Sequence, residues 1–152
     1  MQNPSYAALA GLLQPSRSRE EAMEQVVDAL WSALSSLEVS WLGFYVDHPD
    51  EPADRRLVLG PHRDRPACSP IGLHGVCGAA LLTKSVQIVT DTRALGDAYI
   101  ACDPKDRSEL VLPLLEETGD CWGVFDLDSW AVNRFDASDE QGVRQVLAAA
   151  GL

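Results

Sequence analysis

The sequence predicts an α+β fold, in which an antiparallel β-sheet is flanked by helices and forms a single domain with them. Two long segments, one near each end of the chain, carry apolar residues at helical spacing, and the segments between them are mostly short and β-rich. The expected strands outnumber the regular strand and helix alternation of a Rossmann sheet, and no phosphate-binding glycine motif follows a strand. With 152 residues, the chain is long enough to bury a full hydrophobic core.

The N-terminal part is expected to supply the first long helix. Residues 1–15 hold a short apolar segment, which would form either a packing helix or a loose lead-in. Ser18 and Glu21 then have the S-x-x-E spacing of a capping box, in which each side chain satisfies a backbone N–H group of the other residue. Apolar residues recur at helical spacing after Ser18, which predicts an amphipathic helix over about residues 19–37.

Two β-rich segments follow and are expected to form an antiparallel hairpin. Residues 39–46 and 56–60 are separated by a polar turn that contains proline. Because side chains alternate along a strand, Trp41, Gly43 and Tyr45 would share one face of the first strand. The glycine between two large rings would leave a notch on that face, although ordinary core packing of the rings is an equally good interpretation.

The second half of the chain is expected to contain two helices and three strands. Residues 75–84 are predicted to form a short helix, and residues 86–90 a strand. A hairpin with its turn at residues 116–120 follows. Ser138 and Gln141 then have the spacing of a second capping box, which predicts a C-terminal helix. This order of elements fits a GAF- or PAS-like architecture.

The composition argues against several classes of partner. A net charge of −11 is unsuited to nucleic acid or an anionic membrane, because either would require a basic face. No stretch approaches the roughly 20 apolar residues of a membrane-spanning helix. The first residues lack the basic and apolar regions of a signal peptide, so we expect a cytoplasmic protein. In that compartment, the four cysteines are expected to be free, catalytic or redox-active rather than structural disulfides.

No bound metal is expected. The cysteine spacings include no C-x-x-C pair, and the three histidines do not complete a zinc-binding pattern. Cys77 falls in the first turn of a predicted helix, where the helix dipole and free N–H groups favour a thiolate. Cys121 is expected to pack as a small hydrophobic side chain.

The strongest indication of chemistry lies within residues 99–129. Cys102 occupies a predicted loop, and the two strands after it carry Glu109, Asp126 and Asp128. Residues two apart on a strand share a face, so the two aspartates would point the same way. Like charges side by side in an apolar strand are costly unless they serve a function.

These three carboxylates could instead form a polar strand edge. In that interpretation they would be solvated or paired with Arg107 or Arg134, and would have no catalytic role. The pattern of residues alone leaves both interpretations open.

A sulfoxide substrate fits this set of residues better than an acyl group does. No histidine lies near Cys102 in the sequence, which argues against a Cys-His protease or acyltransferase. A sulfoxide sulfur becomes electrophilic when its oxygen is protonated, and crowding would raise the pKa of at least one carboxyl group enough to supply that proton. Attack by Cys102 would leave a sulfenic acid, which Cys68 or Cys77 could resolve as a disulfide.

Seven short motifs occur in order between about residues 39 and 147. They are W-x-G-F-Y (Trp41 to Tyr45), L-V-L-G-P (Leu57 to Pro61), G-V-C-G (Gly75 to Gly78), I-A-C-D (Ile100 to Asp103), S-E-x-V-x-P-L (Ser108 to Leu114), G-V-x-D-x-D-S (Gly123 to Ser129) and R-F…D-E-Q-G (Arg134 to Gly142). In these motifs the chain resembles the free methionine-(R)-sulfoxide reductases, which are single GAF domains. The resemblance implies reduction of free L-methionine-(R)-sulfoxide to L-methionine.

The resemblance implies a nucleophile and a resolving thiol. Cys102 matches the nucleophile of that family, and Cys68 and Cys77 match its two other cysteines, one of which resolves the sulfenic acid as an intramolecular disulfide. Thioredoxin, supplied with electrons by NADPH, is the implied external reductant, and no cofactor is bound. A homodimer is a further expectation, because GAF domains often pair through their terminal helices.

The resemblance also implies a substrate pocket. Three acids match groups that bind the sulfoxide oxygen or the ammonium group of the substrate: Glu109, Asp126 and Asp128. Two rings match the aromatic wall around its methylthio end: Trp41 and Tyr45. Backbone N–H groups of one loop segment leading into Cys102 would hold the carboxylate of the free amino acid: Tyr99, Ile100 and Ala101.

The chain departs from the family pattern in places. The interval between Cys68 and Cys77 is one residue shorter, which leaves the choice of resolving thiol open. His74 stands where the family has arginine, and residues 104–107 replace a smaller, more polar stretch. Two alternative functions remain, a non-catalytic GAF domain that senses a small ligand and a thiol redox switch that has no substrate.

Overall fold

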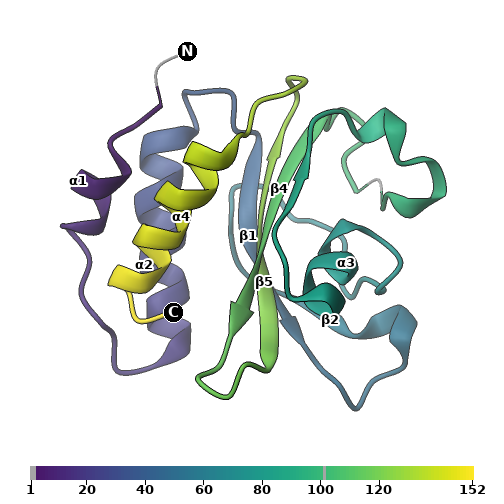
Figure 1. Cartoon of the computed structure of the whole chain (residues 1–152), viewed down its shortest axis with the longest axis horizontal. Helices are drawn as coiled ribbons and strands as arrows, with labels where there is room; N and C mark the ends of the chain where they lie inside the picture. Colours follow the sequence, from purple (N-terminus) through teal and green to yellow (C-terminus); the bar gives the residue numbers. More distant parts are fainter. Residues whose placement is uncertain (1–2, 101) are drawn as a thin grey trace.

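Five strands form one antiparallel sheet at the centre of the computed structural model, which describes residues 3–100 and 102–152 (Figure 1). The strands are β1 (Trp41–Asp47), β2 (Leu57–Arg63), β3 (Gln87–Val89), β4 (Ser108–Leu115) and β5 (Cys121–Ser129). Their order across the sheet is β2-β1-β5-β4-β3, and each neighbouring pair is antiparallel. The predicted antiparallel α+β fold is confirmed, as are the hairpins β1–β2 and β4–β5.

Helices cover both faces of the sheet. One face carries three of them, and the other carries the fourth together with the long loops (Figure 1). The first three are α1 (Tyr6–Ala10), α2 (Arg19–Leu34) and α4 (Ala137–Ala149), and the fourth is α3 (Val76–Thr83). The loops include the short 3-10 helices η1 (Ala53–Arg55), η2 (Thr92–Ala94) and η3 (Gly96–Ala98). No helix in the described part of the chain is both long and apolar enough to cross a membrane.

Alternating side chains of the strands build a separate core on each face. Phe44 of β1 belongs to the core beneath α2 and α4, where the centroid of its ring lies 4.6 Å from that of Phe125 on β5. Trp41 and Tyr45 of β1 belong to the second core, beneath α3. This division follows the two-residue period of a strand and confirms the predicted face of β1. Polar and thiol side chains that the sequence marks as candidates for catalysis lie on the same face of the sheet as the second core.

The long helix α2 begins where the sequence predicts but ends earlier. The Ser18 hydroxyl accepts a hydrogen bond from the Glu21 N–H group, which caps the helix at its predicted start. The helix stops at Leu34 instead of about residue 37. The chain must turn there to enter β1, and Glu38 adopts a left-handed conformation with φ of 65°, which a continuing helix does not permit.

The cap of α4 differs from the predicted one. Asp136 is the N-cap residue, because its side chain accepts hydrogen bonds from the N–H groups of Ser138 and Asp139. The Asp139 carboxylate in turn accepts from the Asp136 N–H group and completes the box. The predicted Ser138–Gln141 box was wrong, because an aspartate at the third helical position can return the bond as glutamate does.

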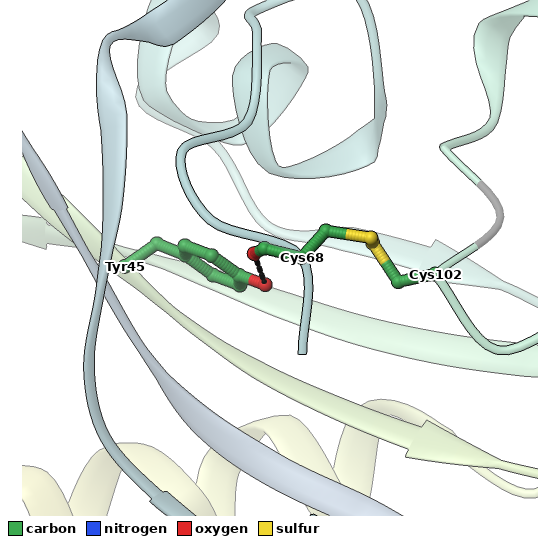
Figure 2. The surroundings of a disulfide bond; sticks show 3 residues. All are labelled: Tyr45, Cys68 and Cys102. Carbon is green, nitrogen blue, oxygen red and sulfur yellow. Dashed lines mark hydrogen bonds between the residues drawn. A yellow bond between two sulfur atoms is a disulfide. The ribbon is translucent and has the colours of Figure 1, made fainter. Parts of the chain in front are cut away.

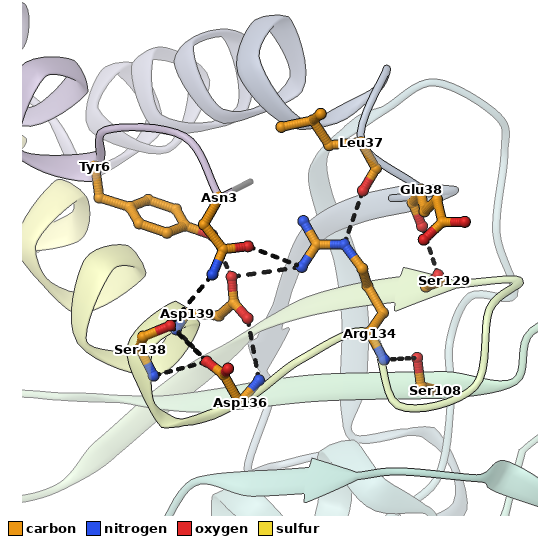
Figure 3. Close-up of polar contacts among 10 residues, drawn as sticks. All are labelled: Asn3, Tyr6, Leu37, Glu38, Ser108, Ser129, Arg134, Asp136, Ser138 and Asp139. Atoms are coloured by element: carbon orange, nitrogen blue, oxygen red, sulfur yellow. Dashed lines mark hydrogen bonds and ion pairs between the residues drawn. The ribbon is translucent and has the colours of Figure 1, made fainter. Parts of the chain in front are cut away.

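A buried polar network attaches α1 to α4 (Figure 3). The Tyr6 hydroxyl donates a hydrogen bond to Asp139 Oδ1 at 2.7 Å, and Arg134 Nη1 lies 3.5 Å from the same oxygen. Arg134 Nε also donates to the Leu37 carbonyl at 2.7 Å. The Tyr6 ring packs against Gly142, where a Cβ atom would lie only 2.0 Å from the ring. The short N-terminal helix α1 is therefore packed against the domain.

Candidate active site

A cavity of about 60 Å³ lies on the face of the sheet that α3 covers. It is bounded by side chains of β1, β4, β5 and α3 and by two loops, which contribute residues 65–67 and, from the second, residues 99–100, 102–103 and 106. It brings together nine of the residues that the sequence singles out: Trp41, Tyr45, Cys77, Tyr99, Ile100, Cys102, Glu109, Asp126 and Asp128.

Strand register explains why the three acids meet. Glu109 of β4 lies directly opposite Asp128 of β5, and Asp126 lies two residues from Asp128 on the same face. Glu109 and Asp126 are each only 5% exposed. The predicted shared face is confirmed. The deep burial of Glu109 and Asp126 excludes a solvated strand edge for these two acids, whereas Asp128 is half-buried.

Burial raises the pKa of all three carboxyl groups. Desolvation raises the pKa of Glu109 to about 7. The pKa values of Asp126 and Asp128 are raised well above the ordinary range of aspartate, in each case first by burial and then by the negative charges of neighbouring acids. Carboxyl groups this close titrate as a unit, so the cluster retains at least one proton near neutral pH.

Among the residues that the structure describes, no arginine forms an ion pair with the three acids. Arg107 instead pairs with Asp91, with 3.2 Å between its guanidinium and the carboxylate, and Arg134 pairs with Asp139. In the described part of the chain, Glu109 Oε2 and Asp126 Oδ1 have no hydrogen-bond partner. Buried acceptors without partners are uncommon in folded proteins, and these two atoms are available to a ligand that brings a donor.

A disulfide joins Cys68 to Cys102 beside this cavity (Figure 2). The two residues are 34 positions apart in the sequence, and their Cα atoms are 5.6 Å apart. Both are exposed, so an external thiol can reach the bond. The Tyr45 hydroxyl donates a hydrogen bond to the Cys68 carbonyl at 2.8 Å and so holds the Cys68 loop against β1 (Figure 2). The sequence left Cys68 and Cys77 open as partners of Cys102, and the structure pairs Cys102 with Cys68.

The third thiol, Cys77, has a different environment. It lies buried in the first turn of α3, and its pKa is raised well above the ordinary value by burial and by the nearby charges of Asp126, Glu109 and Asp128. The expectation of a thiolate at this helix N-terminus was therefore wrong. The helix dipole favours the thiolate, but the negative charges of acids on β4 and β5 disfavour it. These strands approach α3 only in the folded protein, so the sequence around Cys77 does not show their effect.

Three groups of the cavity could together hold a cation. Cys77, Glu109 and Asp126 each place one potential ligand atom within 4.8 Å of the other two, and all three residues are buried. Thiolate and carboxylate ligands suit zinc, but binding would require the cluster to release its protons. The expectation of no bound metal stays a prediction.

The two predicted aromatic residues are present, but the predicted notch between them is filled. Trp41 and Tyr45 are buried, with ring centroids 6.1 Å apart. A Cβ atom on Gly43 would lie 2.6 Å from both the Trp41 ring and His62 Cβ, so the Trp41 indole already occupies the space above the glycine. Gly43 is thus needed for the position of Trp41, and the ring beside it lines the cavity.

Sequence comparison assigns this fold to a known family. A family profile described as "GAF domain" matches residues 16–152. The chain belongs to the GAF domain family. The predicted GAF-like fold is thereby confirmed, and the cavity lies within the matched part of this GAF domain.

Relatives of this GAF domain include proteins named for one reaction. The chain is 42% identical over 113 residues to the free methionine-R-sulfoxide reductase of Escherichia coli K12, an alignment that covers 73% of this chain and 64% of that protein. It therefore spans less than two thirds of this relative. A free methionine-R-sulfoxide reductase from Neisseria meningitidis, solved in complex with its substrate, is 28% identical with a TM-score of 0.81, covering 95% of this chain and 83% of that one.

Another similar structure has a different description. A putative GAF sensor protein from Burkholderia vietnamiensis is 34% identical to the chain with a TM-score of 0.77. The alignment covers 95% of this chain and 89% of that one. Fold similarity alone therefore does not separate the two kinds of GAF domain, and the residues of the site must do so.

The remaining predicted residues lie where the sequence placed them. Tyr99 and Ile100 line the cavity, and the Ile100 side chain packs closely against Gly75 at the start of α3. Ala101 lies outside the described residues, so its predicted role is not tested. Cys121 is half-buried at the start of β5 and packs at the edge of the second core, as expected.

Sequence reasoning missed three polar residues around the cavity. Asp106 is buried, desolvation raises its pKa to about 6, and it accepts a hydrogen bond from the Ser40 hydroxyl at 3.0 Å. Arg65 and Asp103 form an ion pair at the cavity, with 3.0 Å between Nη2 and Oδ2. Asp103 is the last residue of the I-A-C-D motif and could have been noticed there, whereas no sequence pattern marks Asp106 or Arg65.

Proposed function

We propose that this GAF domain reduces free L-methionine-(R)-sulfoxide to L-methionine, with Cys102 as the nucleophile. One observation carries the proposal, namely that Cys102 lies in an accessible disulfide at a cavity whose interior holds three protonatable acids. A ligand-binding domain requires neither group. The names of the Escherichia coli and Neisseria meningitidis relatives support the same reaction.

The acid cluster supplies the proton that activates the sulfoxide. Glu109, Asp126 and Asp128 hold at least one proton near neutral pH, and donation of it to the sulfoxide oxygen makes the sulfur electrophilic. The Cys102 sulfur attacks, the sulfur–oxygen bond of the substrate breaks, and methionine leaves. The oxygen remains on Cys102 as a sulfenic acid, so the substrate sulfur gains the two electrons that the cysteine sulfur loses.

Cys68 resolves the sulfenic acid. Its thiol attacks the Cys102 sulfur, a disulfide forms, and the oxygen leaves as water. Cys77 is a poor competitor, because its thiol is buried and its raised pKa keeps it protonated. An external dithiol, for which we propose thioredoxin reduced through NADPH, then returns both cysteines to thiols. The exposure of Cys68 and Cys102 supports this step.

The rest of the pocket would bind the amino acid. Trp41 and Tyr45 offer apolar surface to the methylthio end, and the loop of Tyr99, Ile100 and Ala101 would offer backbone N–H groups to the carboxylate. An ionised member of the acid cluster would receive the substrate ammonium group, whose positive charge would lower the cost of burying that carboxylate. A protein-bound methionine lacks both charged ends, so the pocket is suited to the free amino acid.

The test is consumption of NADPH in the presence of thioredoxin, thioredoxin reductase and free L-methionine-(R)-sulfoxide. We expect turnover with the (R) epimer and none with the (S) epimer, and no turnover of either by the Cys102→Ser variant. Folded, reduced protein that turns over neither epimer would contradict the proposal. A cytoplasmic location and a homodimer remain predictions.

A GAF sensor that binds a small ligand is the second candidate function. The similarity of this chain to the putative GAF sensor protein from Burkholderia vietnamiensis favours it. A thiol redox switch built on Cys68 and Cys102 is a variant of the same idea. Both predict that methionine sulfoxide is not consumed. The switch also predicts disulfide formation with peroxide at a rate that the sulfoxide does not change.

A further inference from the structure

One ion pair connects the two loops that carry the paired cysteines. Arg65 Nη2 donates to Asp103 Oδ2 at 3.0 Å, three residues before Cys68 on one loop and one residue after Cys102 on the other. Apart from the disulfide, no other hydrogen bond joins residues 64–70 to residues 102–107 in the part of the chain that the structure describes.

We propose that Arg65 and Asp103 are positioning residues, which keep the Cys68 loop against the Cys102 loop while the cysteines are reduced. The pair would thereby set the rate at which Cys68 reaches the sulfenic acid on Cys102. This inference rests on the proposed function only in taking L-methionine-(R)-sulfoxide as the oxidant of Cys102. The formation of the disulfide from the sulfenic acid does not depend on which oxidant is used.

Neighbouring groups fix Asp103 in place. The Trp130 indole N–H donates to Asp103 Oδ2 at 3.0 Å, and the Lys105 backbone N–H donates to Oδ1 at 3.0 Å. Although partial burial opposes ionisation, these hydrogen bonds and the charges of Arg65 and Lys105 lower the pKa of Asp103 below its usual range. Asp103 therefore offers Arg65 a stable, oriented carboxylate.

The Arg65 side of the contact is fixed as well. The Arg65 carbonyl accepts a hydrogen bond from the Trp41 indole N–H at 2.9 Å, and the guanidinium carbon lies 5.1 Å from the centre of the Trp130 ring. The Cys68 loop is thus bound to β1 through Trp41 and Tyr45, independently of the Cys102 loop. Among the described residues, the Arg65 side chain alone makes a hydrogen bond from this anchored loop to Asp103 on the Cys102 loop.

This arrangement matters for one chemical step. When the Cys68 thiolate attacks the Cys102 sulfenic acid, a sulfur–sulfur bond forms, the sulfur–oxygen bond breaks, and hydroxide leaves and takes up a proton to give water. The rate of this intramolecular step depends on the effective concentration of one sulfur at the other. A partly exposed ion pair contributes modestly, so its loss should slow disulfide formation by about twofold to fivefold.

The test is a single turnover of reduced Arg65→Gln and Asp103→Asn variants with one equivalent of L-methionine-(R)-sulfoxide. Rapid quenching with an alkylating reagent separates methionine formation from disulfide formation. We expect methionine to form at the wild-type rate while the disulfide forms about twofold to fivefold more slowly and a dimedone-reactive sulfenic acid accumulates. Disulfide formation at the wild-type rate in both variants would overturn the proposal.

Two further samples exclude an indirect structural effect. Arg17→Gln removes an exposed arginine that lies far from both cysteines in the sequence, and it should leave both rates unchanged. The double variant Arg65→Gln with Asp103→Asn should be no slower than either single variant, because the two residues act through one contact. Additive losses in the double variant would contradict a shared positioning role.

Hydrogen peroxide separates this inference from the proposed function. Peroxide converts the Cys102 thiol to sulfenic acid with release of water, without any sulfoxide. If the wild-type protein fails to reduce methionine sulfoxide but the variants still form the peroxide-driven disulfide more slowly, the positioning role stands and the reductase fails. If the sulfenic acid formed by peroxide decays to the disulfide equally fast in all proteins, as followed by dimedone trapping, the positioning role is wrong whether or not the reductase is confirmed.

Discussion

Two aspartates of this domain are similarly buried but have very different polar partners. Asp139, at the start of α4, is 1% exposed, and it accepts hydrogen bonds from the Tyr6 hydroxyl and the Asp136 N–H group and pairs with Arg134. Asp126, on β5, is 5% exposed, yet one of its oxygens has no partner in the described residues and its nearest charged neighbours are other acids. The two residues differ in partners far more than in burial.

The contrast separates a structural acid from one kept for a ligand. Partnered charges such as Asp139 hold elements together, and breaking the pair leaves a buried charge uncompensated. An unpartnered, protonated cluster weakens the fold and is worth keeping only if something else uses its protons. The same division follows the sheet, because β5 turns Phe125 and Leu127 to the helical core and Asp126 to the cavity.

The largest expected effect follows from removing the nucleophile beside the unpartnered acids. Cys102→Ser should lower the turnover of L-methionine-(R)-sulfoxide to background, because a serine hydroxyl cannot take up the sulfoxide oxygen, whereas a cysteine sulfur can and becomes a sulfenic acid. Substrate binding, measured by calorimetry, should persist because the acids remain. Turnover within tenfold of the wild type would remove Cys102 from the mechanism.

The next effect concerns the cavity acid itself. Asp126→Asn should lower kcat by about 10²-fold to 10⁴-fold, the usual range for loss of a general acid. Its melting temperature should be unchanged or higher, since the substitution removes a carboxyl group that burial destabilises. A parallel loss of stability and activity would make Asp126 a structural residue like Asp139.

The matched substitution at the partnered acid should do the reverse. Asp139→Asn leaves Arg134 buried without its counter-charge and should lower the free energy of unfolding by about 3–5 kcal/mol. Well below its melting temperature, this variant should keep the wild-type kcat. Tyr6→Phe, which removes one hydrogen bond from the same network, should cost only about 1–3 kcal/mol in chemical denaturation.

The dependence of stability on pH should come from the cavity acids. Burial raises the pKa of Glu109 from 4.5 to about 7, so its contribution to stability is fully present below pH 4.5 and is lost as the pH rises through 7. The free energy of unfolding should therefore fall over this window less steeply in Glu109→Gln than in the wild type. Identical slopes in denaturation series at several pH values would show that Glu109 ionises normally.

The smallest effect is expected at the thiol outside the site. Cys121 donates a hydrogen bond to the Gly123 carbonyl at 3.2 Å, and a serine hydroxyl can donate the same bond. Cys121→Ser should change the free energy of unfolding by no more than about 0.5 kcal/mol and leave turnover unchanged. A fall in turnover would place a fourth cysteine in the redox cycle.

The parts of the fold that depend on local patterns could be predicted from the sequence. The two-residue alternation of residues 39–46 and of β5 placed Trp41 on the cavity face and brought Asp126 and Asp128 to one side. The start of α2 followed from Ser18 because a cap is a contact between residues close in sequence.

Features that depend on distant contacts could not be predicted in this way. The partner of Cys102 is 34 residues away on a separate loop, so spacing could not choose between Cys68 and Cys77. The helix position of Cys77 suggested a thiolate, and only the approach of β4 and β5 shows that acids oppose it. Arg65 gave no signal at all, because its role depends on a contact with Asp103 across the cavity.

A single turnover analysed by mass spectrometry tests directly whether Cys102 reduces the sulfoxide and Cys68 resolves it. Reduced protein is mixed with one equivalent of L-methionine-(R)-sulfoxide, quenched by alkylation, digested and searched for disulfide-linked peptides. We expect one methionine formed per protein together with one peptide pair that links Cys68 to Cys102, and Cys77 alkylated after denaturation. Methionine formed with a Cys77 linkage, or a Cys68–Cys102 bond formed without any methionine, would contradict it.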